Sequence, residues 1–98
     1  MTIDKKLNGT ELTVVLEGRL DTTTAPQLEK SLAESLSGVQ KLILDMKGLE
    51  YLSSAGLRVL LATQKTMNKQ GAMELRNVNA TIMEVFEITG LSNMLVIR

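Results

Sequence analysis

The sequence contains no histidine, no cysteine and no tryptophan among its 98 residues. Without histidine, the chain lacks the commonest general base of hydrolases and the commonest nitrogen ligand of metal enzymes. Without cysteine, disulfides, thiol nucleophiles and thiolate metal ligands are excluded. We therefore expect a protein that is not an enzyme, with no catalytic residues, no metal site and no cofactor.

The chain also lacks an excess of charge of either sign, because eleven basic residues balance eleven acidic ones. The chain therefore has no excess of positive charge to attract nucleic acid, and it has no polybasic stretch to bind a membrane surface. No apolar run approaches the roughly 18 residues of a spanning helix, and residues 1–6 have no secretory apolar region. We expect no nucleic-acid partner and no membrane insertion.

The composition is that of an ordinary globular protein, with 44% hydrophobic and 22% charged residues. The length suits one modest core. No internal repeat, low-complexity segment or linker interrupts it, and we expect a single domain over residues 1–98.

Local patterns predict an opening hairpin followed by a helix. Strands are expected over residues 3–7 and 11–17, joined by a turn at Asn8-Gly9, and Gly18 should close the second strand. Thr24 is expected to cap a helix with Gln27 at capping-box spacing, and Ser37-Gly38 should end that helix. Its core face is formed by four residues at helical spacing: Ala25, Leu28, Leu32 and Leu36.

The rest of the chain alternates between strands and helices. Strands are expected at 41–46, 73–76 and 95–97, a loop at 47–52, a helix from Ser53-Ser54 to Gln70-Gly71, and a helix capped by Asn79 and ended by Gly90. This order predicts an α/β fold, in which a mixed, mostly parallel sheet carries helices packed on it. Asp45 and Ser54 should both lie at the edge where parallel strands end, which is where sites usually form.

Two segments are similar to one known family. The first reads DMKGLEYLSSAGL from Asp45 to Leu57, and the second reads GRLDTTTAPQL from Gly18 to Leu28. Together, in this order and spacing, they resemble the signatures of STAS domains, the family named for sulfate transporters and anti-sigma-factor antagonists. The family usually has aspartate where this chain has Ser53.

The resemblance implies a cytoplasmic, phosphorylation-switched binding protein of the anti-sigma-factor-antagonist type. In such proteins, an anti-sigma factor with serine kinase activity phosphorylates one serine, and a PPM-type serine phosphatase removes the phosphate. The unphosphorylated antagonist binds the anti-sigma factor. The matching serine is Ser54, with Ser53 as the alternative, and the resemblance points to Asp21 as an acid that shapes the site.

Each candidate residue also has a purely structural interpretation. Ser53 or Ser54 could simply cap the helix, and Asp21 or Asp45 could satisfy turn N–H groups. Gly56 is expected to allow close approach of helix and strand.

Other residues are candidates for contact with a partner. These are Ser53, Ala55 and Arg58, although Arg58 could equally be a solvated surface residue. An apolar contact patch or the core could hold Leu49, Leu52, Met83 and Met94.

Two other functions compete with the phosphorylated switch. One is a STAS interaction or scaffold domain without phosphorylation, in a sensor or membrane-transport complex. The other is an enzyme with Ser54 as nucleophile, which the missing histidine and the absence of phosphate-binding glycine motifs argue against.

Overall fold

The computed structural model describes all residues from 1 to 98 and contains a four-stranded sheet in the order β1-β2-β3-β4. The elements along the chain are β1 (Thr2–Asn8), β2 (Glu11–Leu20), α1 (Ala25–Ser35), β3 (Lys41–Leu52), α2 (Ser54–Asn68), β4 (Ala72–Arg76), α3 (Ala80–Ile88) and the 3₁₀ turn η1 (Leu91–Asn93). β1 and β2 are antiparallel, whereas β2–β3 and β3–β4 are parallel. The predicted α/β class with a mixed, mostly parallel sheet is confirmed.

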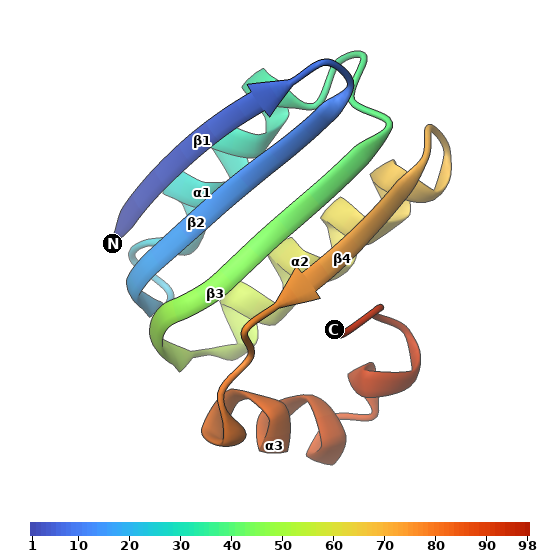
Figure 1. Ribbon diagram of the computed structural model, residues 1–98. Helices are drawn as coiled ribbons and strands as arrows, with labels where there is room; N and C mark the ends of the chain where they lie inside the picture. The colour runs from blue at the N-terminus through green and yellow to red at the C-terminus, as the bar shows by residue number, and fades with distance from the viewer.

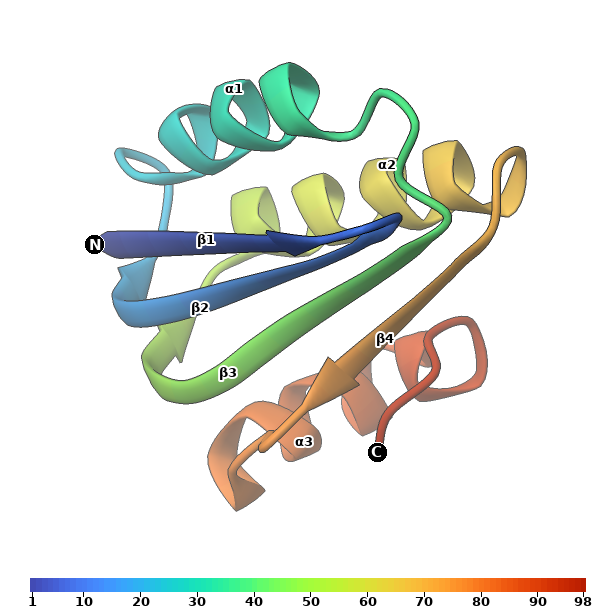
Figure 2. The same ribbon diagram turned by 45° about the horizontal axis from the view of Figure 1, so that its top comes forward.

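The helices are divided between two places. α1 and α2 lie side by side behind the sheet, whereas α3 and the C-terminal turn lie beyond the ends of β3 and β4 (Figures 1 and 2). One continuous core of 24 buried residues joins strands and helices, including all four apolar residues predicted for α1. No helix is long and apolar enough to cross a membrane.

The opening hairpin differs from the prediction at both ends. Asn8 pairs with Glu11 as the last residue of β1, so the two-residue turn consists of Gly9 and Thr10, with Gly9 at a φ of +64°. The turn is therefore one residue later than expected. β2 does not end at Gly18 but continues to Leu20, because its pairing with β3 continues past the glycine.

The start of α1 is also held differently from the prediction. Thr24 occupies the cap position, but its side chain makes no capping bond to the helix. Its hydroxyl instead donates to the Arg19 carbonyl and accepts from the Asp21 N–H, both at 2.8 Å. The predicted capping box does not form, since the Thr24 N–H donates to the Asp21 carboxylate at 3.1 Å and not to the Gln27 side chain.

The largest departure from the prediction concerns β3. Residues 47–52 are not a loop but the second half of a twelve-residue strand, which pairs with the ten residues of β2. The pairing register shifts twice, which leaves one extra residue opposite Leu16 and a second, Glu50, between two paired residues. These two β-bulges change the spacing of buried residues from two to three, at Met46, Leu49 and Leu52.

The last third of the chain follows the prediction except at its end. Asn79 caps α3 by accepting from the Ile82 N–H at 2.9 Å, and Gly90 has a φ of +75° after the helix. The expected final strand is reduced to a single parallel bridge between Ile97 and Leu75. Because the turn η1 occupies residues 91–93 before this bridge, pairing along the edge of β4 is limited to that single bridge.

Glu74 lies on the face of the sheet that α1 and α2 leave open, and it is only 8% exposed. Arg76 donates a hydrogen bond to the Glu74 carboxylate and forms an ion pair with it. Lys41 and Arg98 lie 3.9 and 3.6 Å from the same carboxylate. Burial acts to raise the pKa of Glu74, but the Arg76 hydrogen bond and then the charges of Arg76, Lys41 and Arg98 outweigh it. The pKa is therefore held below 4.5.

We expect Glu74→Gln to lower the free energy of unfolding by about 1–3 kcal/mol near neutral pH, because it removes charged hydrogen bonds. A lowered pKa contributes stability above the unfolded value, and that contribution is lost as pH falls through the folded value. The wild-type advantage should therefore shrink as pH falls below 4.5. Urea unfolding at neutral pH and at about pH 3 measures this difference. Glu84→Gln, at an exposed residue of α3, is the control; an advantage independent of pH would contradict the assignment.

Candidate functional site

Ser53 and Ser54 lie where β3 passes into α2. Ser53 is the N-cap, because its hydroxyl accepts from the Gly56 N–H at 3.3 Å and its carbonyl accepts from the Leu57 N–H at 3.0 Å. Ser54 is the first residue of the helix; its side chain is exposed and makes no hydrogen bond within the protein. The two serines thus divide the roles that the sequence left open: Ser53 holds the helix start and Ser54 presents a free hydroxyl.

Asp21 lies beside this helix start and organises the loop before α1. The Ser53 N–H donates to the Leu20 carbonyl at 2.9 Å, which brings the two loops together. One Asp21 oxygen accepts from the backbone N–H groups of Thr23 and Thr24 at 3.0 and 3.1 Å, and from the Thr23 hydroxyl at 2.7 Å. The hydrogen bond from the Thr23 hydroxyl lowers the pKa of Asp21. Burial opposes this effect, and the backbone hydrogen bonds add to it. The turn-forming interpretation of Asp21 is confirmed.

Gly56 allows the helix to approach the sheet closely, as expected. A Cβ atom at this position would lie 2.7 Å from the Leu20 Cγ and 2.7 Å from the Leu52 Cδ1. Both leucines are buried and cannot move aside freely. The glycine therefore fixes how near Ser53 and Ser54 lie to the end of β2.

Ala55 and Arg58 line an open hollow of about 190 Å³ between the starts of α1 and α2. Its other walls are formed by Thr22, Ala25, Pro26, Glu29 and Val59. Arg58 is exposed, one helical turn after Ser54, and has no ion-pair partner within 4.0 Å. A free cation therefore lies one helical turn after the free hydroxyl.

The structure does not bring Asp45 to this site. β3 continues for seven residues after Asp45, which is about 20 Å at the usual strand rise. Asp45 instead accepts from the Lys47 N–H and from the Asn77 side-chain amide, both at 3.0 Å. The expectation that Asp45 shapes the site is wrong because the bulges let the strand run on past it.

The four apolar residues considered for a contact patch or for the core do not form one patch. Leu49 and Leu52 belong to the core, Met83 is partly buried, and Met94, directly after η1, is 58% exposed. Burial rather than partner contact therefore accounts for the two leucines.

One pair of residues near the site has no counterpart in the sequence-based prediction. Arg19 and Tyr51 are partners across β2 and β3, and the Arg19 guanidinium carbon lies 4.2 Å from the centre of the Tyr51 ring. Asp21 lies 3.8 Å from the Arg19 Nε. The signal available in the sequence was the single tyrosine two residues before Ser53, in a chain with only two aromatic residues.

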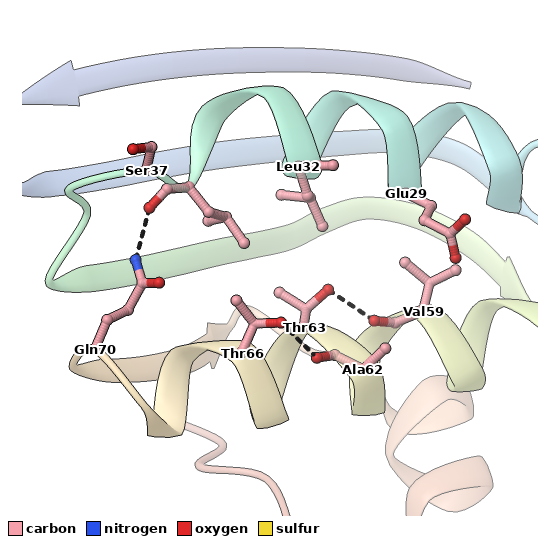
Figure 3. Close-up of a pocket in the computed structure, with 10 residues that line it drawn as sticks. Glu29, Leu32, Ser37, Val59, Ala62, Thr63, Thr66 and Gln70 are labelled. Atoms are coloured by element: carbon pink, nitrogen blue, oxygen red, sulfur yellow. Dashed lines mark hydrogen bonds between the residues drawn. The ribbon is translucent and has the colours of Figure 1, made fainter.

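A furrow of about 350 Å³ runs between α1 and α2, and its lining includes the buried side chains of Leu32 and Val59 (Figure 3). The Thr63 and Thr66 hydroxyls donate to carbonyls of their own helix at 2.7 and 3.1 Å. At the far end of the furrow, the Gln70 amide donates to two carbonyls, those of Leu36 and Val39, at 2.6 Å. These donors hold the helices and are not directed at a ligand.

The division of roles between the two serines predicts different stability effects. Ser53→Ala should lower the free energy of unfolding by about 0.5–2 kcal/mol, because it removes the cap. The free energy of unfolding of Ser54→Ala should stay within about 0.5 kcal/mol of the wild-type value, because the lost hydroxyl has no hydrogen-bond partner. Ser53→Asp keeps a capping oxygen and should restore stability. Thermal or urea unfolding checks this; a larger loss in Ser54→Ala than in Ser53→Ala would contradict the assigned cap.

Comparison with known proteins identifies the family. The family model described as STAS domain matches residues 2–98. BtrV of Bordetella bronchiseptica, which carries a provisional assignment as an anti-sigma factor antagonist, is 39% identical over 92% of this chain and 78% of its own. The anti-sigma-B factor antagonist of Bacillus subtilis is 31% identical over 97% of this chain and 88% of its own.

Solved structures agree on the fold. An anti-sigma factor antagonist from Mycobacterium paratuberculosis superposes with a TM-score of 0.89 at 24% identity, over 98% of this chain and 83% of its own. The antagonist SpoIIAA has TM-scores of 0.78 in its unphosphorylated form and 0.77 in its phosphorylated form. These two comparisons, at 17% and 19% identity, cover 99% of this chain and 87% and 91% of SpoIIAA. The family match over nearly the whole length and the two curated relatives show that this chain belongs to the STAS domain family.

Proposed function

We propose that this protein is an anti-sigma-factor antagonist whose binding to an anti-sigma factor is switched by phosphorylation of Ser54. The unmodified protein binds an anti-sigma factor that has serine kinase activity. Transfer of the ATP γ-phosphoryl group to the Ser54 oxygen displaces the hydroxyl proton and ADP. A PPM-type serine phosphatase hydrolyses the ester and restores the binding form.

The observation that carries the proposal is the exposed Ser54 hydroxyl, which makes no hydrogen bond within the protein at the first residue of α2. A kinase can reach this hydroxyl without unfolding the helix, because Ser53 rather than Ser54 holds the cap. The helix N-terminus also favours the added negative charge. The relatives named as antagonists support the same role.

The proposed role is binding rather than catalysis. Ser54 has no base within hydrogen-bond reach that could activate it as a nucleophile, and the chain contains no histidine to serve as one. Among the residues near Ser54, Asp21 is engaged by its own turn, and the Arg58 guanidinium has no acceptor atom.

Ser54→Ala is expected to abolish phosphorylation by the cognate kinase. The family resemblance implies that the anti-sigma factor is an ATPase with a histidine-kinase-like ATP-binding fold. Each such ATPase encoded in the source genome would be purified and incubated with this protein and ATP, and added phosphate would be counted and mapped by mass spectrometry. Wild type should gain one phosphate, on Ser54, and Ser53→Ala should still be modified. Labelling that persists in Ser54→Ala and disappears in Ser53→Ala would move the site by one residue.

A second candidate function is a STAS interaction or scaffold domain that is never phosphorylated, in a sensor or membrane-transport complex. The observation that favours it is Ser53, which keeps the cap but removes the carboxylate that the family usually carries there. Binding of an ATPase without phosphate transfer under any nucleotide condition would favour this second function.

A further inference from the structure

Arg19 and Tyr51 form a small platform on the outward side of the sheet end. The Glu50 bulge brings them together, because it makes Tyr51 rather than Glu50 the partner of Arg19 while Leu52 pairs with Leu20. Leu20 and Leu52 point into the core, so their strand neighbours point outward. Tyr51 is 42% exposed, whereas the only other aromatic residue, Phe86, is completely buried.

The Arg19 guanidinium is held in place at two points, and its ion pair with Asp21 involves only Nε. The Tyr51 ring lies under it at 4.2 Å, and the Asp21 carboxylate lies 3.8 Å from its Nε, beyond hydrogen-bond distance. Asp21 is itself fixed by the turn of Thr23 and Thr24. No acceptor in the protein engages the terminal nitrogens of Arg19, and its side chain is 59% exposed. The outward N–H groups are therefore positioned and unused.

This platform and the proposed switch lie at the same end of the sheet and are joined through the backbone. The Leu20 carbonyl, between Arg19 and Asp21 in the chain, accepts from the Ser53 N–H, and only two residues separate Tyr51 from Ser54. A partner surface that covers Ser54 is therefore placed to touch Arg19 as well.

We propose that Arg19, stacked on Tyr51, binds a carboxylate of the anti-sigma factor and is a main anchor of that interface; this inference rests on the proposed function. A guanidinium presents two parallel N–H groups that match a carboxylate. Stacking restricts the long side chain before binding, so less conformational entropy is lost when the partner arrives. Arginine and tyrosine are also the residue types over-represented among the few that dominate interface energies.

The test measures the affinity of the ATPase identified above for a set of variants by titration calorimetry. Arg19→Ala should weaken binding at least about 30-fold. Arg19→Lys should weaken binding nearly as much, because it keeps the charge but loses the paired N–H groups. Tyr51→Phe should bind like wild type, because the ring face is kept, and Tyr51→Ala should weaken binding about tenfold. Lys6→Ala, which removes an exposed positive charge in the middle of β1, should have no effect.

Two further measurements identify the chemistry. The double variant Arg19→Ala/Tyr51→Ala should bind no more weakly than Arg19→Ala alone, because the ring acts by positioning the guanidinium. Arg19→Glu should be rescued by one Asp→Arg or Glu→Arg change in the ATPase, which identifies the carboxylate. Amide spectra of each variant establish whether it is folded. If Tyr51→Ala does not fold, Tyr51→Phe and Arg19→Lys still test the inference.

The outcomes separate this inference from the proposed function. If no ATPase of the source genome binds the wild type, the proposed function fails and the anchor fails with it. If one binds and Arg19→Ala binds equally well, only the anchor is overturned. Arg19→Lys at wild-type affinity would also overturn it, because long-range charge attraction would then be sufficient.

Discussion

Phosphorylation of Ser54 is expected to weaken binding to the anti-sigma factor a few hundredfold while leaving the fold unchanged. The phosphate adds a charge of about −1.5 to −2 at an exposed residue of a helix N-terminus, where the dipole favours it. The same charge is unfavourable beneath a partner, which must desolvate it or supply a cation. A loss of about 3–4 kcal/mol in binding free energy corresponds to this factor.

Titrations of the unmodified and phosphorylated protein with the anti-sigma factor, together with backbone amide spectra of both forms, test this expectation. Shifts should be confined to the start of α2 and the neighbouring Asp21 loop. Ser54→Asp should reproduce part of the loss, because it carries one charge and less bulk. Ser37→Asp adds a charge at an exposed position beyond the far end of α1 and serves as the control. Widespread spectral change would contradict the local mechanism, and unchanged affinity would contradict the switch.

Leu60→Ala is expected to lower the free energy of unfolding by about 2–5 kcal/mol. Leu60 is 0% exposed on the face of α2 that packs against the sheet, so the change removes buried surface and leaves a cavity. Leu32→Ala, at a residue of α1 that is 2% exposed, should cost a similar amount. Such a loss is a large part of the stability of a domain this small.

The matched control is Leu7→Ala, the same substitution at a leucine of β1 that is 64% exposed. Leu7→Ala should lower the free energy of unfolding by only about 0.5 kcal/mol. Urea unfolding measures the three losses. They can be compared directly when the unfolding free energy falls with urea concentration at the same slope in all three variants. Equal losses in Leu60→Ala and Leu7→Ala would contradict the placement of α2 on the core.

The three helices and two of their three caps could be predicted because their signals are local. Ser53 and Asn79 each precede a run of apolar residues at helical spacing, and both accept a hydrogen bond from the third residue that follows. The second half of β3 could not be predicted in this way. Its buried residues are three apart rather than two, because each bulge inserts a residue that faces solvent. The alternation that marks a strand is therefore missing from the sequence.

The candidate site was predictable where it lies within one stretch of chain and unpredictable where it depends on register. Ser54 and the Asp21 turn come from two short motifs, and the structure places them side by side. The Arg19–Tyr51 pair arises from strand pairing, which two bulges shift by two residues. Asp45 was placed wrongly for the same reason, since its distance from Ser54 depends on a strand end that the pattern concealed.

The two extra residues of β3 also limit how this chain can change in length. From Met46 to Leu52, inward and outward positions follow from the number of residues as much as from their identity. Deleting Glu50 would remove the second bulge and keep the register on both sides of it, because Gly18 would still pair with Leu49 and Arg19 with Tyr51. Deleting a paired residue such as Ile43 would instead exchange inward and outward positions, which is equivalent to several simultaneous substitutions. Length changes are far better tolerated in the exposed turn at Gly9 and Thr10, where only the hairpin connection is affected.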